Sequence, residues 1–317
     1  MTSPSLKTIA HAAGVSKTTA SFVLNGKGDQ HKINKEPQER VLKIAAEHNY
    51  RPSFLSQVFN SGKTKTIGLV APHLNHAYIH ELVQHISVKL DPLNFRLLPA
   101  FSKGSEEEER RIVADFRERY VEAIIAIQPV NADSFKDTSG KIVPTLYIDH
   151  KTHAETPTIL LDLKEGTNLL LQHHIRRHRK AIGFIDVQNS ATSEISATYT
   201  SNYVERFGIN AQYHFSATCF GDVGRALVQL QDKKVNAILF ESPQLALRTM
   251  QQKMEEKITL SDEIELSCVG WMPELELSYT KVTGLKFDQA EIAEIVTQFI
   301  SADFKDLETK RVVPTLC

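Results

Sequence analysis

The chain has 317 residues, which at about 150 residues per domain predicts two domains. Hydrophobic residues make up 41% of it and charged residues 24%, so a disordered, fibrous or collagen-like protein is excluded. No stretch approaches the roughly 18 consecutive apolar residues of a membrane helix, so we expect no membrane partner. The N-terminus has no apolar core with a cleavage site, and the three cysteines, Cys219, Cys268 and Cys317, lie far apart. We therefore expect a cytoplasmic protein without a disulfide framework or a zinc cluster.

The charge is unevenly distributed along the chain. Residues 1–65 carry eight Lys and two Arg against four acidic residues, a charge of +6. The remainder carries 27 basic and 34 acidic residues, a charge of −7. A short basic head on a longer acidic body is typical of a nucleic-acid-binding module joined to a regulatory or binding domain. Chance clustering of surface lysines is the alternative, and charge alone does not decide between them.

Three short helices are predicted within residues 1–52. Gly14 ends the apolar pattern of the first helix, and Ser16 is placed to cap a second helix that ends at Asn25. Asn34 is placed to cap a third helix that stops near Tyr50. Their apolar faces are formed by Leu6, Ile9, Ala10 and Ala13, then Ala20, Val23 and Leu24, and then Val41, Leu42, Ile44 and Ala45.

Residues 53–65 are predicted to form a hinge between the head and the body. Pro52 favours extended backbone at the residue before it. Ser53 could cap a short helix over residues 54–60, which is too short to be stable alone and needs a surface on which to fold.

The body, residues 66–317, alternates short apolar runs with helical patterns, which predicts parallel sheets with right-handed crossovers. The expected strands are Ile67–Ala71, Phe95–Ala100, Ala123–Ile127, Thr145–Ile148, Thr158–Leu161, Ala181–Ile185, Ala237–Phe240 and Leu266–Val269. The expected helices are Tyr78–Leu90, Glu106–Tyr120, Gly166–Ile175, Val223–Gln231 and Leu245–Lys257. The fold class is therefore α/β, with two doubly wound lobes formed by successive groups of about 100 residues and a cleft between them.

The start of the predicted second helix has side chains suited to DNA. Residues 6–25 have the spacing of a helix-turn-helix, whose second helix enters the major groove. Lys17 can donate to guanine, Thr18 and Ser21 to a base or phosphate, and Phe22 can contact a thymine methyl group. Further lysines that could lie near phosphates are Lys27, Lys32 and Lys35. The alternative is a plain three-helix bundle, in which an exposed phenylalanine and the surplus charge have no purpose.

Several motifs resemble the lactose/galactose repressor (LacI/GalR) family. They are Ile9-Ala10-x-x-Ala13-Gly14-Val15-Ser16-x-x-Thr19-Ala20-Ser21-x-Val23-Leu24-Asn25, Asn49-Tyr50-x-Pro52 and Lys63-Thr64-x-Thr66-Ile67-Gly68-Leu69-Val70. Residues 16–27 are most similar to the fructose and sucrose repressor branch. The resemblance implies a body like a type I periplasmic binding protein. It also implies a homodimer or tetramer that binds a pseudo-palindromic operator on double-stranded DNA and responds to a small metabolite.

The resemblance also implies a set of DNA contacts. In the family, a hinge helix folds on DNA and a leucine pair wedges into the minor groove; Phe59 occupies that position here, and Ser56 would face the groove. The alternative for Phe59 is a contact between linker and body. The expected DNA-binding residues are Ser16, Lys17, Thr18, Thr19, Ser21, Phe22, Asn25, Lys35, Tyr50, Ser53, Ser56 and Phe59.

The family holds its metabolite, often a sugar or sugar phosphate, in the cleft between the lobes. The expected effector-binding residues are Asn75, Tyr78, Asp149, Tyr199, Glu241 and Trp271. This sequence departs from the family pattern at Tyr199, where arginine is usual, at Glu241-Ser242, and at Met272, where a carboxylate is usual. Either the effector differs, with Tyr78, Trp271 and Met272 suited to a more apolar or stacked ligand, or the cleft is vestigial and a protein partner exerts control.

Two histidine-rich segments have competing interpretations. His73, His76 and His80 lie beside the expected cleft, but no accompanying carboxylate motif supports a metal, so we expect none. The basic run from His173 to Lys180 is interpreted as a solvated helix end, with a phosphorylated partner as the alternative.

The sequence as a whole predicts a DNA-binding transcriptional regulator. We expect a repressor of carbohydrate-related genes, with no cofactor and no enzymatic activity. A solute-binding protein is disfavoured by the head, and a nucleotide-dependent enzyme by the lack of a G-x-G-x-x-G turn or a P-loop.

Overall fold

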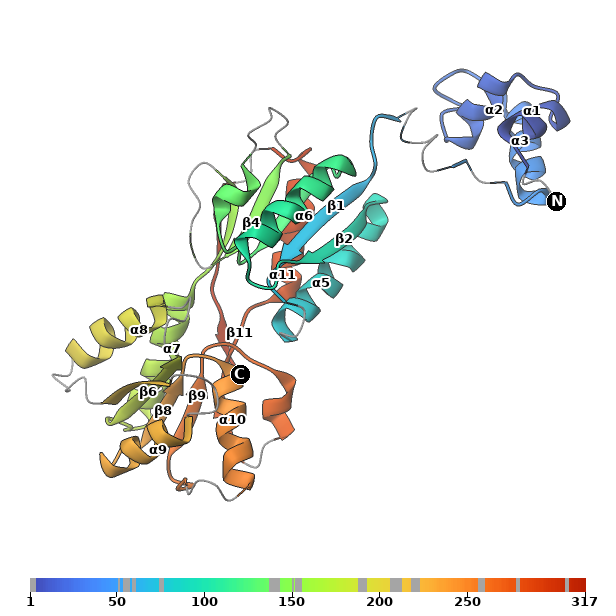
Figure 1. The fold of residues 1–317 in the computed structure, drawn as a ribbon. Coiled ribbons are helices and arrows are strands. Elements are labelled where there is room, and N and C mark those ends of the chain that lie inside the picture. The colour runs from blue at the N-terminus through green and yellow to red at the C-terminus, as the bar shows by residue number, and fades with distance from the viewer. Residues whose placement is uncertain are drawn as a thin grey trace. The chain divides into compact units, whose positions relative to one another are not determined.

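The computed structural model describes residues 4–50, 52–53, 58, 61–73, 77–136, 143–149, 151, 156–187, 193–205, 213–217, 223–255, 260–277, 280–305 and 308–317. The chain forms two compact units, Met1–Lys65 and Thr66–Cys317 (Figure 1). Among the described residues, no helix combines the length and hydropathy that a membrane crossing needs.

The first unit contains the three predicted helices, α1 (Leu6–Ala12), α2 (Lys17–Leu24) and α3 (Lys35–Glu47). Gly14 adopts a φ of +65° between α1 and α2, a conformation that glycine reaches without strain. The three helices enclose one apolar cluster of Ile9, Ala10, Ala13, Ala20, Val23, Val41 and Ala45. The three-helix prediction is confirmed, except that α3 ends three residues before Tyr50.

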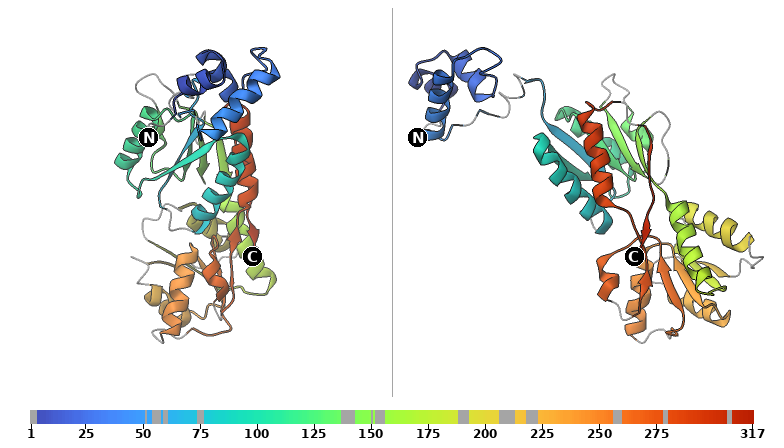
Figure 2. Two further views of the ribbon diagram at one scale, coloured as in Figure 1. Left: turned by 90° about the vertical axis from the view of Figure 1, so that its right-hand side faces the viewer. Right: turned by 180° about the vertical axis from the view of Figure 1, so that it is seen from behind.

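The first lobe of the second unit contains a six-stranded sheet in the order β12-β5-β4-β3-β1-β2, in which every pairing is parallel. The strands are β1 (Thr66–Ala71), β2 (Arg96–Phe101), β3 (Ala123–Ile127), β4 (Thr145–Asp149), β5 (Thr158–Leu161) and β12 (Lys310–Val312). Helices α5 (Ala77–Leu90) and α11 (Gln289–Ser301) cover one face and lie side by side (Figure 2). Helix α6 (Glu106–Glu118) covers the other face, where Phe116 packs against Gly68.

The second lobe contains a five-stranded parallel sheet in the order β10-β9-β8-β6-β7. Its strands are β6 (Ile182–Val187), β7 (His214–Ala217), β8 (Ala237–Phe240), β9 (Glu265–Cys268) and β10 (Val282–Thr283). Helices α7 (Leu163–Arg176) and α8 (Ser193–Tyr199) pack on one face, and α9 (Val223–Asp232) and α10 (Pro243–Met254) pack on the other. The α/β fold class is therefore confirmed, and the expected strands and helices of the body agree with the structure to within three residues at each end.

The path of the C-terminal segment corrects the expected order of the lobes. After β10, the chain returns to the first lobe, where α11 packs on α5 and β12 pairs with β5. A two-stranded antiparallel sheet, β11 (Leu285–Lys286) with β13 (Thr315–Leu316), accompanies the crossing. The lobes are therefore not two successive groups of residues. Sequence periodicity could not show this, because an apolar strand carries no mark of the sheet in which it will pair.

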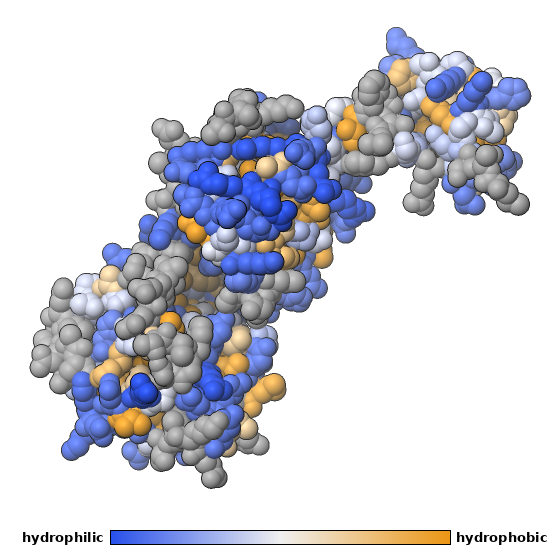
Figure 3. Space-filling model, viewed as in Figure 1, coloured by the Kyte–Doolittle hydropathy of each residue, from blue (hydrophilic) through white to orange (hydrophobic). Residues whose placement is uncertain are grey.

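The acidic run at the start of α6 is structural. Ser105 Oγ accepts a hydrogen bond from Glu108 N at 3.3 Å, which caps the helix. Ion pairs one turn apart, such as Arg110 with Glu106, connect the charged residues along its exposed side. This side forms the hydrophilic band over the first lobe in Figure 3.

Candidate nucleic-acid interface and ligand cleft

The N-terminus of α2 presents free polar side chains to solvent. Ser16 Oγ accepts a hydrogen bond from Thr19 N at 3.0 Å and lies 2.8 Å from Thr19 Oγ1, so these two hydroxyls form the helix cap. Lys17 and Thr18, at the first two positions of the helix, are exposed. Within the described residues neither side chain has a hydrogen bond or ion pair. Both are therefore available to an external partner.

Phe22 is not the free, exposed side chain that the sequence predicted. It is half-buried and its ring stacks on that of His31, with centroids 3.5 Å apart and planes 11° apart. Asn25 is also engaged within the head, because its Nδ2 donates to Ser21 O at 2.7 Å at the end of α2. These contacts hold the C-terminal half of α2 and leave its first turn as the accessible part.

Lys35 forms an ion pair in this structure. Its Nζ lies 2.9 Å from Asp29 Oδ1, and Gln38 Nε2 donates to the same carboxylate at 2.8 Å. These interactions, that of Gln38 first and that of Lys35 second, hold the pKa of Asp29 below its ordinary value. The Lys35 side chain remains 74% exposed. Exposed pairs of this kind contribute little, so a phosphate can compete with Asp29 for the ammonium group.

The remaining predicted DNA contacts lie at the end of the head and in the hinge. Tyr50 packs against the apolar cluster of the head, and burial raises the pKa of its hydroxyl group. Ser53 is exposed. Ser56 and Phe59 lie outside the described residues, so their roles stay predictions.

A cavity of about 240 Å³ lies between the lobes of the second unit. Gln128 follows β3, Glu241 follows β8, and Val269 follows β9, so the cavity lies at the carboxyl ends of these parallel strands, where open α/β sheets bind ligands. The other lining residues are Tyr78, Ile79, Glu81, Leu161, Leu163, Ile195, Ser242, Pro243, Gln244, Gly270, Trp271, Leu285, Lys286, Phe287 and Gln289.

Three of the predicted effector residues line this cavity. Glu241 is buried and accepts a hydrogen bond from Val187 N at 2.9 Å. The Tyr78 hydroxyl group is buried and has no hydrogen-bond partner among the described residues, and desolvation raises its pKa. Trp271 lies against Gly284, where a Cβ atom would come within 2.4 Å of the indole ring. Glycine at position 284 therefore makes room for the indole.

The other predicted effector residues do not line it. Tyr199 is wrong as a ligand contact: its side chain is fully buried in the second-lobe core, stacks on Phe184, and donates to Ile182 O at 2.7 Å. Asp149 is buried at the end of β4 and is not among the lining residues. Asn75 lies outside the described residues. Met272 packs into the apolar core beside α10, so it does not supply a thioether to the cavity.

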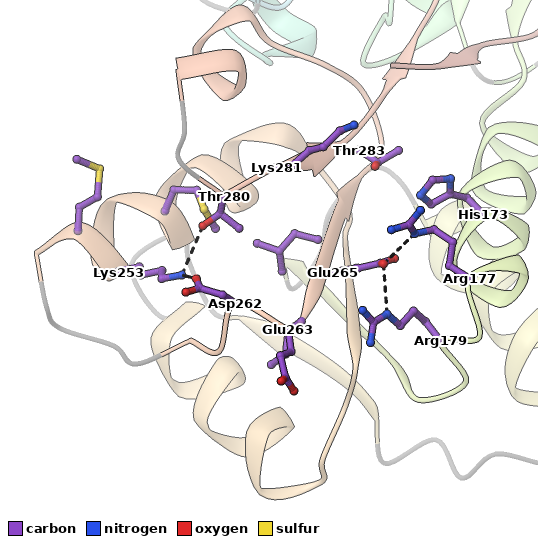
Figure 4. A pocket seen from close by; sticks show the side chains of 14 residues that line it. His173, Arg177, Arg179, Lys253, Asp262, Glu263, Glu265, Thr280, Lys281 and Thr283 are labelled. Atoms are coloured by element: carbon purple, nitrogen blue, oxygen red, sulfur yellow. Dashed lines mark hydrogen bonds and ion pairs between the residues drawn. The ribbon is translucent and has the colours of Figure 1, made fainter.

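A larger cavity of about 760 Å³ lies at another edge of the second lobe (Figure 4). Arg177 and Arg179, from the segment after α7, both pair with Glu265 at the start of β9, at 2.8 and 3.3 Å. Lys253 pairs with Asp262 at 2.6 Å. Each of these three cations is therefore paired with a carboxylate of the same wall, with Glu265 shared between two guanidinium groups.

The basic run lies at the end of α7 with Arg176–His178 and Lys180 exposed, as the solvated helix end predicts, but His174 departs from this interpretation. The side chain of His174 is fully buried, and its Nε2 is hydrogen-bonded to Ser267 Oγ at 2.7 Å. Side-chain contacts from the basic run therefore hold the C-terminal end of α7 against β9. Sequence reasoning missed this, because nothing in the run distinguishes the inward histidine from its exposed neighbours.

Comparison with known proteins agrees with this architecture. Residues 5–53 match the family model of bacterial regulatory proteins of the lacI family. The head is a lacI-family helix-turn-helix domain. Over 174 residues the chain is 35% identical to the catabolite repressor/activator of Escherichia coli (strain K12), a match that covers 54% of this chain and 52% of that protein. The chain thus spans about half the length of that relative.

Two further comparisons extend beyond the lacI-family head. The sucrose operon repressor of Klebsiella pneumoniae is 26% identical over 222 residues, which are 67% of this chain and 66% of that protein. The crystal structure of the Lac repressor dimer bound to operator and the anti-inducer ONPF matches with a TM-score of 0.83 at 18% identity. This match covers 99% of this chain and 98% of that chain, and it shows that the whole chain has the Lac repressor fold.

Proposed function

We propose that this chain is a sequence-specific, DNA-binding transcriptional regulator that acts as a repressor of carbohydrate-related genes. It would bind a pseudo-palindromic operator as a homodimer, with the first turn of α2 in the major groove. The observation that carries the proposal is the pair of exposed, unengaged side chains at that turn, Lys17 and Thr18, on a lacI-family head. Catalysis has no role in this proposal.

Operator affinity would be modulated by a small metabolite in the cavity between the lobes. This cavity lies at the carboxyl ends of the strands, and its walls come from both lobes and from the crossing segments. A ligand there can bind one relative arrangement of the lobes more tightly than another, which is the requirement for a population shift. The operator-bound and metabolite-bound states would then be linked by a coupling free energy of about 1–3 kcal/mol.

The test uses the two lysines of the head, which have different expected roles. A duplex is first selected from a random library, and its affinity and that of a random duplex are then measured by fluorescence anisotropy at two salt concentrations. Lys17→Ala should weaken binding of the selected duplex by about 1–3 kcal/mol, roughly 5- to 150-fold, with a much smaller effect on the random duplex. Lys35→Ala should weaken both alike and lower the salt slope, since a phosphate contact carries no sequence information.

Lys164→Ala is the matched control, because Lys164 is an exposed lysine at the start of α7 in the other unit. It removes the same charge and should leave both duplex affinities unchanged. An equal loss on both duplexes for Lys17→Ala would contradict its placement at the bases. Failure of the unaltered chain to bind any duplex in dilute buffer would refute the proposed function itself.

A further inference from the structure

The charged groups of the cavity between the lobes are mainly negative. The described lining contains two carboxylates, those of Glu81 and Glu241, and one ammonium group, that of Lys286. Lys286 is exposed, whereas Glu241 is only 6% exposed. No arginine is present in this described lining. A phosphate or carboxylate on a ligand would therefore meet a fixed buried carboxylate and only one cation at the rim.

The backbone holds the carboxylate of Glu241 in place. Its Oε2 accepts a hydrogen bond from Val187 N at 2.9 Å, at the end of β6, which pairs with β8. A ligand at the carboxyl ends of these strands would therefore meet a negative group whose position is fixed by the fold.

Uncharged polar side chains also line the cavity. Gln128 follows β3 in the first lobe, and Ser242 follows Glu241 in the second. Both are partly exposed. Amide and hydroxyl groups can donate to and accept from the hydroxyl groups of a ligand, so these side chains suit a hydroxylated ligand.

The aromatic side chains and the volume limit the shape of the ligand. The Trp271 indole is partly exposed at the cavity and is held from behind by Gly284. Tyr78 and Phe287 form an edge-to-face pair with centroids 6.3 Å apart. A volume of about 240 Å³ is below the roughly 300–1,000 Å³ of typical drug-sized sites, so about one ring can be enclosed. An indole face also attracts a cation that is placed over it.

We propose that this cavity binds a single hydroxylated ring that bears a positively charged amino group, an amino sugar, and that it rejects sugar phosphates and sugar acids. The inference rests on the proposed function, because it names the ligand class of the same regulatory site. Glu241 and Glu81 would pair with the amine, Gln128 and Ser242 would bond hydroxyl groups, and Trp271 would stack on the ring.

The experiment uses the tryptophan as an intrinsic probe, because Trp271 is the only tryptophan in the 317-residue sequence. The full chain is titrated at pH 7 with a matched panel of glucose, galactose and mannose, each as the neutral sugar, the 2-amino-2-deoxy sugar and the 6-phosphate. In at least one series the amino sugar should change the fluorescence with an affinity tenfold or more above that of the neutral sugar, and the phosphate should bind weakest. A phosphate that binds more tightly than its amino counterpart, or no response to any compound at 10 mM, overturns the proposal.

Two variants test the charge argument. Glu241→Gln retains an oxygen that can accept from Val187 N but removes the buried charge. It should reduce the preference for the amino sugar over the neutral sugar to about onefold. Glu107→Gln, on the exposed side of α6, removes the same charge far along the chain and should leave the preference unchanged. An undiminished preference in Glu241→Gln refutes the assigned role.

Duplex binding of each preparation is also measured by anisotropy without sugar. This measurement distinguishes a failure of the proposed ligand class from a failure of the proposed DNA-binding function. Retained duplex binding without a preference for amino sugars refutes the ligand class and leaves the regulator intact. Loss of duplex binding in the unaltered chain refutes the proposed function instead.

Discussion

His174 provides a prediction in which buried electrostatics controls stability. Its Nε2 is hydrogen-bonded to Ser267 Oγ, and its Nδ1 lies 3.5 Å from Glu265 Oε2. Arg177 and Arg179 pair with the same carboxylate, and their hydrogen bonds hold the pKa of Glu265 below its ordinary value although burial works to raise it. The carboxylate is thus shared with two permanent cations. Its hydrogen bond and its charge work to raise the pKa of His174, but burial of the imidazole outweighs both.

Burial, followed by repulsion from its neighbour on α7, lowers the pKa of His174 from 6.5 to about 4. Between these values the unfolded chain binds a proton that the folded chain does not, so stability falls as the pH falls from about 6.5 towards 4. Below about 4 both states are protonated, and no further loss arises from this group. Each pH unit within the window corresponds to about 1.4 kcal/mol, so lowering the pH from 7 to 5 should destabilise the second lobe by about 2 kcal/mol.

The measurement compares urea unfolding at pH 7 and pH 5, at one protein concentration, for the unaltered chain and for His174→Gln. The fluorescence of Trp271 follows the transition, because this residue belongs to the same lobe and the DNA-binding head can unfold separately. The variant should lose about 2 kcal/mol less than the unaltered chain between the two pH values, whatever its stability at pH 7. His85→Gln, at an exposed position of α5, should keep the original dependence. The same pH dependence in all three proteins would refute the reasoning.

Three further predictions concern the packing of the elements that carry the site. Ser16→Ala should cost the head about 1 kcal/mol by removing the α2 cap, seen as faster hydrogen exchange of head amides with no change in the body. Gly68→Ala should cost about 1–3 kcal/mol in urea unfolding, because its Cβ would lie 2.4 Å from the buried ring of Phe116; an unchanged midpoint would contradict that packing. Tyr199→Phe should lower the free energy of unfolding by about 1–3 kcal/mol, because Ile182 O loses the hydrogen bond from the tyrosine hydroxyl group. The fluorescence response to ligand should stay intact. A lost response with unchanged stability would instead support a direct contact between Tyr199 and the ligand.

The head could be predicted almost completely from the sequence, because its determinants are local. Gly14 adopts the positive φ that its position between two helical patterns indicated, and Ser16 caps α2 through its own side chain. Most strands of both sheets were predictable for a similar reason, although β7, β10 and β12 were not predicted. Each buried parallel strand is a short apolar run, and β3 and β8 begin and end at the predicted residues.

The direction of individual side chains and the contacts between separate segments were harder to predict from the sequence. Tyr199 was placed in the cleft because it falls near the position of the family's ligand-binding arginine, whereas helix α8 directs its side chain into the core. The pairing of Phe22 with His31 joins residues nine positions apart across the end of α2, and no periodicity predicts it. Strand β7 was missed because its burial is partial and its apolar signal is correspondingly weak.

The return of the chain to the first lobe has a consequence for regulation. Leu161 and Leu163 lie where the chain first leaves that lobe, and residues 285–289 lie where it comes back; both segments line the cavity between the lobes. A ligand there contacts the segments whose backbone angles set the arrangement of the lobes. The second of these segments leads into α11, which packs along α5 on the face of the sheet that contains β1. Since β1 begins at Thr66, directly after the predicted hinge, a change at the crossings would reach the start of the body through these packed elements. The same ligand contacts would therefore determine both the arrangement of the lobes and the position of β1, the strand that follows the hinge.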